Sequence, residues 1–168
     1  MEKQILSKRR NKVDKNWKDL WEYHYSENLK YVPRWPDNFA IKFFGRISKS
    51  VVLRGKKVLD LGCGGGKDLI LIDKMGMSAY GIEISENAIK LAEKYVKEWG
   101  ANAEIRLYDG KNIPYPDSFF DFVISLGVLD HMKFSDALSL VNEEIYRVLV
   151  SSGYLCASLH SVKDSNYG

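Results

Sequence analysis

The stretch VLDLGCGGG, residues 58–66, decides the fold of this chain of 168 residues. Its first four residues read as a short buried strand that carries one charged residue, Asp60. The glycines that follow let the backbone turn sharply and approach a ligand, and residues 67–74 continue as a helix whose N-terminus faces the same place. A second strand, residues 78–82, leads to Glu83, a carboxylate placed to accept hydrogen bonds from both hydroxyls of a ribose. Glycines in this strand-turn-helix-strand context predict a site for a nucleoside cofactor.

The position of Asp60 separates two classes of nucleoside cofactor. The NAD fingerprint is G-x-G-x-x-G with a pyrophosphate on the helix N-terminus, whereas this chain reads D-x-G-x-G-x-G. A carboxylate ahead of the glycines is unfavourable beside a pyrophosphate but suits a cofactor that carries an ammonium and a sulfonium. On residues 58–66, and on GIEIS at 81–85, the chain resembles the class I S-adenosylmethionine (SAM)-dependent methyltransferases, in the manner of a type 11/25-like domain. The resemblance implies SAM as cofactor and S-adenosylhomocysteine as product; a nicotinamide oxidoreductase stays open as a more distant alternative.

Further motifs extend the resemblance over residues 36–168. They are RLYDG at 106–110, IPYPDSFFD at 113–121 and EIYRVL at 144–149 ahead of the strand near residue 154. The family implies that Asp109 binds the adenine amino group, that the Gly110 N–H binds another ring atom, and that the loop 126–132 flanks the transferable methyl. The complete set of cofactor-binding residues that it implies is Asp60, Gly62, Cys63, Gly64, Glu83, Ile84, Asp109, Gly110, Ser125 and Leu126.

The order of strands and helices predicts an α/β fold, a Rossmann-like doubly wound parallel sheet with helices on both faces. The resemblance implies the strand order 3-2-1-4-5 with the cofactor at the carboxyl ends of the strands. Three residues are expected to cap helices: Asp37, Ser85 and Ser135. We expect one domain over residues 1–168, with an N-terminal helical lid at 1–50 and a core at 51–168.

The resemblance also indicates what the chain lacks. Complete members of the family add a sixth and an antiparallel seventh strand after the fifth. Without them the edge at residues 155–159 would be apolar and unpaired. We therefore expect a fragment of a longer protein, or a partner or N-terminal element that covers this edge.

Aromatic residues near the N-terminus predict a helix that lies over the cofactor. Apolar and aromatic side chains recur at helical spacing in this segment, at Val13, Trp17, Leu20, Trp21 and His24. A larger aromatic cluster could line the lid: Trp21, Tyr23, Tyr25, Tyr31 and Trp35. Aromatic faces stabilise a nearby sulfonium by about 1 kcal/mol per contact. We expect one of Tyr23, Tyr31 or Trp35 to touch cofactor or substrate.

Methyl transfer asks for few catalytic side chains. The reaction is an in-line displacement, so the protein mainly orders the nucleophile and excludes water. A general base is needed only for an acceptor that arrives protonated. His131 is the candidate base, with His160 second, although a lone histidine is as often a hydrogen-bonded support. Since neither the Asn-Pro-Pro-Tyr motif nor a catalytic cysteine pair follows strand four, small molecules are the leading acceptor class; a tRNA or protein methyltransferase and a noncatalytic SAM-binding module remain alternatives.

Composition and charge fit one compact domain in the cytoplasm. The chain is 45% hydrophobic and 28% charged, and we expect no membrane span, no metal site and no disulfide between Cys63 and Cys156. Residues 1–57 hold 15 Lys and Arg against 6 Asp and Glu, a net of +9, so residues 58–168 carry 10 against 16, a net of −6. The basic part could attract nucleic acid, but charge runs are more often a solvated face. A homodimer also stays open.

Overall fold

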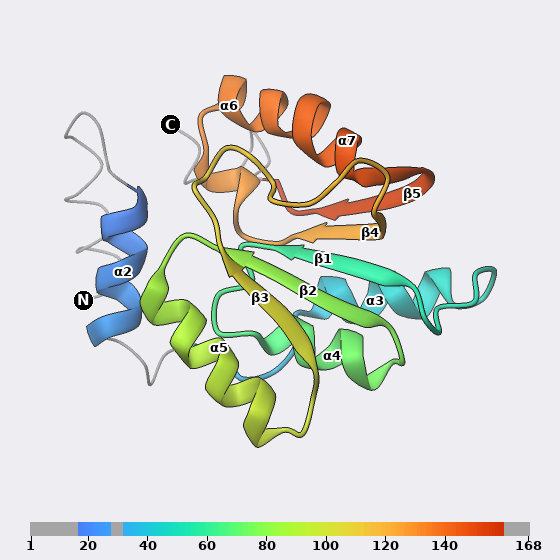
Figure 1. Cartoon of the computed structure of the whole chain (residues 1–168), viewed down its shortest axis with the longest axis horizontal. Helices are drawn as coiled ribbons and strands as arrows, with labels where there is room; N and C mark the ends of the chain where they lie inside the picture. The colour runs from blue at the N-terminus through green and yellow to red at the C-terminus, as the bar shows by residue number, and fades with distance from the viewer. Residues whose placement is uncertain (1–16, 28–31, 160–168) are drawn as a thin grey trace.

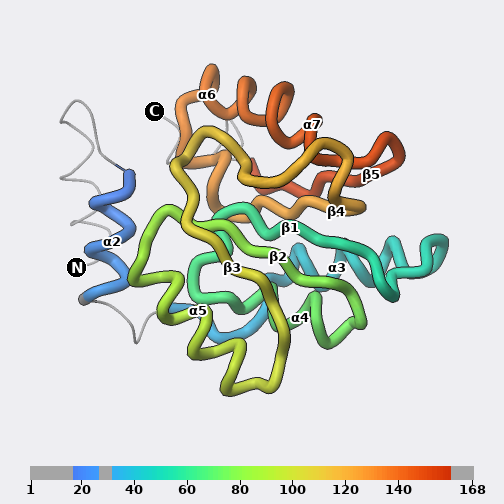
Figure 2. Tube along the Cα trace, in the orientation of Figure 1, coloured from blue at the N-terminus to red at the C-terminus, as the bar shows by residue number. Residues whose placement is uncertain are grey.

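Five apolar segments form a parallel sheet in the order β3-β2-β1-β4-β5, as predicted (Figure 1). The structure is a computed structural model, and it describes residues 17–27 and 32–159. The strands are β1 (Lys57–Leu61), β2 (Ser78–Glu83), β3 (Ala103–Leu107), β4 (Phe120–Ser125) and β5 (Leu149–Ala157). Every neighbouring pair is parallel. The trace leaves β1 toward β3 and then returns to the other side of β1 to form β4 (Figure 2). The strand order therefore reverses between β1 and β4, where open α/β sheets bind ligands.

Helices cover both faces of the sheet because alternate strand residues point to opposite sides. One core joins residues such as Val58 and Phe122 to helices α3 (Asn38–Ile47), α4 (Lys67–Lys74) and α5 (Glu86–Glu98). The other core joins Leu59 and Val123 to the continuous helical stretch that follows β4. That stretch consists of α6 (Phe134–Ser139), the π-helical η3 (Leu140–Ile145) and α7 (Tyr146–Val148), after the short 3₁₀-helix η2 (Leu129–His131).

Two of the three predicted helix caps are confirmed. The carboxylate of Asp37 accepts a hydrogen bond from the Phe39 N–H at 2.8 Å, and the hydroxyl of Ser85 accepts from the Ala88 N–H at 3.1 Å. The prediction for Ser135 is wrong, because this residue lies inside α6. The backbone N–H groups of residues 136 and 137 both donate to the Lys133 carbonyl at 3.0 Å, so the first turn starts at Lys133, two residues earlier.

Glycine is required at two places where elements pack closely. Gly66 precedes α4 with φ of 81°, and a Cβ there would lie 3.0 Å from the Ala92 Cβ of α5. In β2, a Cβ on Gly81 would lie 2.8 Å from the Cys63 sulfur and 2.9 Å from a Leu69 methyl. These contacts bring the glycine-rich turn close to β2 and α5. The turn and Glu83 therefore lie together at the carboxyl ends of β1 and β2.

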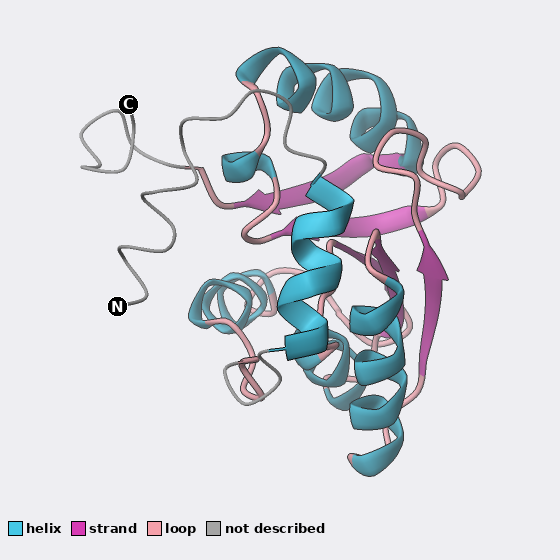
Figure 3. Cartoon of the chain, turned by 90° about the vertical axis from the view of Figure 1, so that its left-hand side faces the viewer, coloured by secondary structure: helices cyan, strands magenta, loops and turns pink. Residues whose placement is uncertain are grey.

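Helix α2 (Trp17–Glu27) lies outside the two layers (Figure 1). It packs against α5 and crosses in front of the carboxyl ends of the strands (Figure 3). The N-terminal helix predicted from the sequence is therefore present, and its described part is α2. No helix in the described parts of the chain has the length and apolarity that a membrane crossing requires.

Candidate cofactor and acceptor site

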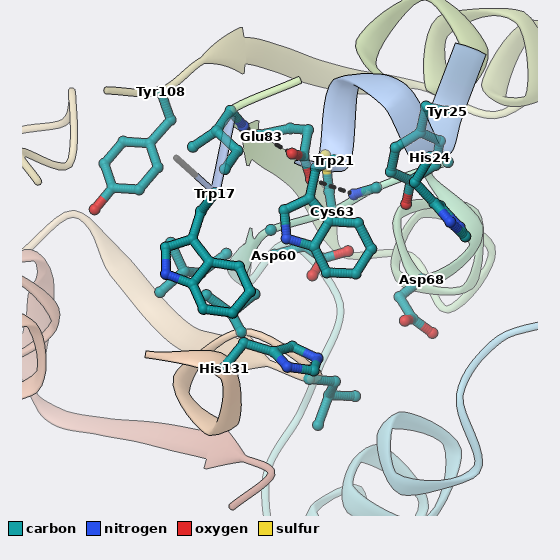
Figure 4. Close-up of a pocket in the computed structure, with 18 of the residues that line it drawn as sticks. Trp17, Trp21, His24, Tyr25, Asp60, Cys63, Asp68, Glu83, Tyr108 and His131 are labelled. Carbon is teal, nitrogen blue, oxygen red and sulfur yellow. Dashed lines mark hydrogen bonds between the residues drawn. The ribbon is translucent and has the colours of Figure 1, made fainter. Parts of the chain in front are cut away.

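A cavity of about 460 Å³ opens at the carboxyl ends of the strands, below α2. It is bounded by the glycine-rich turn on one side, by the loop after β4 on another, and by aromatic side chains of α2 (Figure 4). A volume of this size suits a small-molecule ligand. The lining residues are Trp17, Trp21, His24, Tyr25, Val32, Pro33, Asp60, Leu61, Gly62, Cys63, Gly64, Gly65, Lys67, Asp68, Glu83, Ile84, Tyr108, Gly110, Leu126, Gly127, Val128, His131, Met132 and Leu140.

Glu83 is held rigidly at the base of this cavity. One carboxylate oxygen accepts from the Gly64 N–H at 3.0 Å, and the other accepts from the N–H groups of Ile84 and Ser85 at 2.8 and 3.0 Å. Burial raises the pKa of Glu83, although these three hydrogen bonds oppose the shift. A carboxylate has about four acceptor positions, so about one position is left to accept from a ligand hydroxyl. The side chain is oriented before any ligand arrives.

The charges in the cavity favour a ligand with a positive group. The charged side chains among the described lining residues are Asp60, Asp68, Glu83 and Lys67. Lys67 lies 3.4 Å from the carboxylates of both Asp37 and Asp68. Asp60 is 4% exposed; burial raises its pKa well above the ordinary value, and the nearby Asp68 adds to the shift. A cation that enters the cavity would therefore stabilise the ionised form of Asp60.

The wall that α2 contributes is aromatic. The His131 ring, on η2, lies 6.0 Å from the Trp17 ring and 5.8 Å from the Trp21 ring, so both indoles border the loop after β4 (Figure 4). From the predicted aromatic cluster, Trp21 and Tyr25 line the cavity.

We predicted that Tyr23, Tyr31 or Trp35 touches the cofactor or substrate. The described residues give this prediction no support. Tyr23 is 52% exposed and Trp35 is 73% exposed, and neither lines the cavity. The Trp35 ring instead lies 5.9 Å from the Trp99 ring, and Tyr31 lies outside the described residues.

The structure brings most of the sequence-predicted site residues to this cavity. His131 lines it, together with all of the expected cofactor-binding residues except Asp109 and Ser125. The Asp109 carboxylate accepts from the N–H groups of Lys111 and Asn112 at 2.7 and 2.8 Å, and hydrogen bonds from Asn112 and Lys111 lower its pKa. Ser125 is fully buried. His160 lies outside the described residues.

Sequence reasoning missed Tyr108, Asp68 and Leu140, which also line the cavity. Tyr108 is 8% exposed, and its hydroxyl finds no hydrogen-bond partner in the described part of the chain. Its place directly before Asp109, at the carboxyl end of β3, was a signal for this position. The sequence held no comparable signal for Asp68 or Leu140, because the packing of their helices brings these residues to the cavity.

Comparison with known proteins identifies the family of this chain. Residues 59–157 match the family described as "Methyltransferase domain", so the chain belongs to this family. The ubiquinone biosynthesis O-methyltransferase of Rhizobium rhizogenes is 35% identical over 94 residues, which are 55% of this chain and 38% of that enzyme. The chain therefore spans well under half the length of this curated relative.

Solved structures agree with the family. The PH0226 protein from Pyrococcus horikoshii OT3 superimposes with a TM-score of 0.65 at 28% identity, covering 80% of this chain and 64% of that one. A SAM-dependent methyltransferase from Methanosarcina mazei gives a TM-score of 0.59 at 29% identity, covering 66% and 54%. The family and the Methanosarcina neighbour imply SAM as the cofactor.

The cavity fits this cofactor on three structural features. Glu83 retains an acceptor position for a ribose hydroxyl. The buried Asp60 suits a cationic amino-acid end. The indole faces of Trp17 and Trp21 in the cavity lining suit a sulfonium.

Proposed function

We propose that this chain binds SAM and transfers its methyl group to a small-molecule acceptor. The observation that carries the proposal is the pre-oriented Glu83 carboxylate in a cavity that also holds the buried Asp60. When bound, SAM supplies a methyl group that is already electrophilic because it is attached to a sulfonium. The protein's task is then to orient the acceptor and to exclude water.

In this proposal, the aromatic side chains of α2 exclude water from the cavity. The indoles of Trp17 and Trp21 close the side of the cavity that faces away from the sheet, next to His131. Their faces also stabilise a nearby cation, by about 1 kcal/mol per contact. We propose that α2 forms the lid of a single domain. The predicted boundary between a lid at 1–50 and a core at 51–168 has to shift, because α3 packs within the core through Ala40 and Phe44.

His131 is the proposed proton acceptor for an acceptor group that arrives protonated. It lines the cavity on η2, in the loop after β4. Its replacement by asparagine should lower kcat for a hydroxyl acceptor by about 10²- to 10⁴-fold and leave SAM affinity unchanged. If the His131→Asn variant and the wild-type chain have equal kcat at every pH, the His131 ring has only a supporting role.

A small hydroxyl-bearing molecule is the first acceptor class to test. The Rhizobium relative is named as an O-methyltransferase of ubiquinone biosynthesis, and a cavity of about 460 Å³ is small for a macromolecular acceptor together with a cofactor. A screen of phenols, carboxylates, amines and thiols, read out as S-adenosylhomocysteine release, identifies the acceptor. Turnover of tRNA or protein but of no small molecule would overturn this class.

The cofactor is tested by calorimetric titration with SAM and S-adenosylhomocysteine. Glu83→Gln should weaken both ligands by about 1 to 3 kcal/mol, because a charge-assisted hydrogen bond to ribose is lost. Glu93→Gln makes the same chemical change at an exposed position of α5 and should leave both affinities unchanged. Failure of the wild-type chain to bind either ligand would overturn the proposal, and binding of NADH instead would replace it with an oxidoreductase.

We also propose a cytoplasmic location for the chain. Its two cysteines, both among the described residues, are free, as is usual where thiols are kept reduced. Fractionation of cells that express a tagged chain tests the location, and size-exclusion chromatography with light scattering tests the homodimer that the sequence left open.

A further inference from the structure

The glycine-rich turn uses nearly all of its own backbone donors. Of the N–H groups of residues 62–66, four donate to acceptors inside the core. Those of Gly62 and Cys63 donate to the Ile82 carbonyl, that of Gly64 to the Glu83 carboxylate, and that of Gly66 to the Cys63 carbonyl, at 2.8, 3.1, 3.0 and 2.9 Å. The fifth N–H is that of Gly65, and the hydroxyl of Tyr25 on α2 lies close to this part of the turn.

Tyr25 reaches this position by extending from α2 into the cavity. Its ring lies 6.3 Å from the Trp21 ring and 5.4 Å from the His24 ring, within the aromatic wall. Its hydroxyl lies so close to the turn that a Cβ on Gly64 would overlap it. Figure 4 shows the Tyr25 hydroxyl directed toward the part of the site that contains Cys63 and Glu83.

The amino-acid end of the cofactor brings a carboxylate that needs donors. Within the described lining of the cavity, the cationic side chain is Lys67, whose ammonium lies 3.4 Å from both the Asp37 and the Asp68 carboxylates. Since those two acids already surround Lys67, the incoming carboxylate has to be bound largely by neutral donors. The Gly65 N–H is next to α4, whose N-terminus also favours negative charge.

We propose that Tyr25 is the lid residue that binds the carboxylate of the cofactor's amino-acid end, together with the Gly65 N–H. A phenolic hydroxyl carries one proton, which Tyr25 can donate to a carboxylate. Burial raises the pKa of Tyr25, with Glu83 adding to the shift, so the phenol keeps this proton at neutral pH. The inference rests on the proposed function and adds to it a direct link between α2 and the cofactor.

Two ligands that differ in the amino-acid end test this assignment by calorimetry. S-adenosylhomocysteine carries the carboxylate, whereas 5′-methylthioadenosine keeps the adenosine and the thioether but has no amino-acid end. Tyr25→Phe should weaken S-adenosylhomocysteine about ten- to hundredfold, the value of one hydrogen bond to a charged group, and leave 5′-methylthioadenosine within about twofold. Retained binding of 5′-methylthioadenosine also shows that the variant is folded.

Two control variants complete the design. Tyr23→Phe removes the same hydroxyl from an exposed position on the same helix and should change neither affinity. Glu83→Gln should weaken both ligands, because both carry the ribose. Equal weakening of both ligands by Tyr25→Phe would show a structural role for the ring and overturn the assignment, as would an unchanged affinity for S-adenosylhomocysteine. A wild-type chain that binds neither ligand would overturn the proposed function, and this inference with it.

Discussion

The carboxylate of Glu22 on α2 accepts a hydrogen bond from the hydroxyl of Ser85, the residue that caps α5. The same carboxylate accepts from the N–H groups of Glu86 and Asn87, at 3.1 Å each. Helix N-termini leave their first N–H groups without partners inside the helix. Glu22 therefore supplies a second cap for α5 from another helix, and this contact holds the aromatic wall over the cavity.

Glu22→Ala should detach α2 without unfolding the core. We expect a loss of about 0.5 to 2 kcal/mol, the range for a lost helix cap, and faster amide hydrogen exchange in α2 than in the strands. Ser26→Ala on the same helix is the control, since its exposed hydroxyl donates to the carbonyl of Tyr23 at 2.9 Å. Unchanged exchange in α2 of the Glu22 variant would show that the helix is held by its apolar contacts instead.

The docking of α2 should weaken in acid. Burial raises the pKa of Glu22, but hydrogen bonds from Ser85, Asn87 and Glu86 outweigh this effect, so its folded pKa lies below the ordinary value of 4.5. A lowered pKa means that the stabilisation is complete above 4.5 and is lost as the pH falls through the folded value. Tryptophan fluorescence of α2, titrated from neutral to acidic pH, should show a transition that Glu22→Ala lacks. The same transition in both proteins would assign it to another group.

Gly81→Ala should destabilise the whole domain. The new Cβ would lie 2.8 Å from the Cys63 sulfur and 2.9 Å from a Leu69 methyl, in a fully packed core. Overpacking of this kind costs about 1 to 3 kcal/mol. The control is Gly45→Ala in α3, where a Cβ meets nothing within 4 Å and should gain up to about 1 kcal/mol from helix propensity. Urea unfolding measures both, and equal stability of the two variants would contradict the packing argument.

Arg147→Lys should loosen the segment that leads into β4. The guanidinium donates to the carbonyls of Ile113 and Tyr115 at 3.0 and 2.8 Å and to Asp117 at 2.9 Å, and it pairs with Glu144 at 2.7 Å. Lysine cannot reproduce this planar fork, so we expect a loss of about 1 to 3 kcal/mol in thermal unfolding. Arg46→Lys at an exposed position of α3 should leave the melting temperature unchanged. A similar melting temperature for both variants would show that a single charge suffices at position 147.

The sequence was most informative where backbone geometry alone defines a position. The turn at residues 62–66 and Glu83 follow directly from glycine spacing and strand ends, and the parallel sheet follows from the alternation of strands and helices. The helical spacing of Trp17 and Trp21 predicted a face that docks on the domain, and both residues line the cavity.

Side-chain contacts between distant elements were beyond sequence reasoning. Helical periodicity assigns Tyr25 to α2 but cannot say that its hydroxyl lies beside the glycine-rich turn. The choice among neighbouring aromatic residues favoured Tyr23, Tyr31 or Trp35; Tyr23 and Trp35 are exposed, and Tyr31 lies outside the described residues. Asp109 was placed by its motif, yet its carboxylate bonds to its own loop. Such outcomes depend on local competition among donors, which spacing does not encode.

The internal hydrogen bonding of the turn at residues 62–66 has a consequence for the thermodynamics of ligand binding. Because four of its five N–H groups already have acceptors, the turn is pre-organised, and a ligand loses little affinity to the ordering of this backbone. We expect the conformational entropy lost on binding to fall mainly on α2, which is attached to α5 through Glu22. We therefore expect the opening of α2 to gate ligand exchange, so that release rates respond to changes in that helix more strongly than to changes in the sheet.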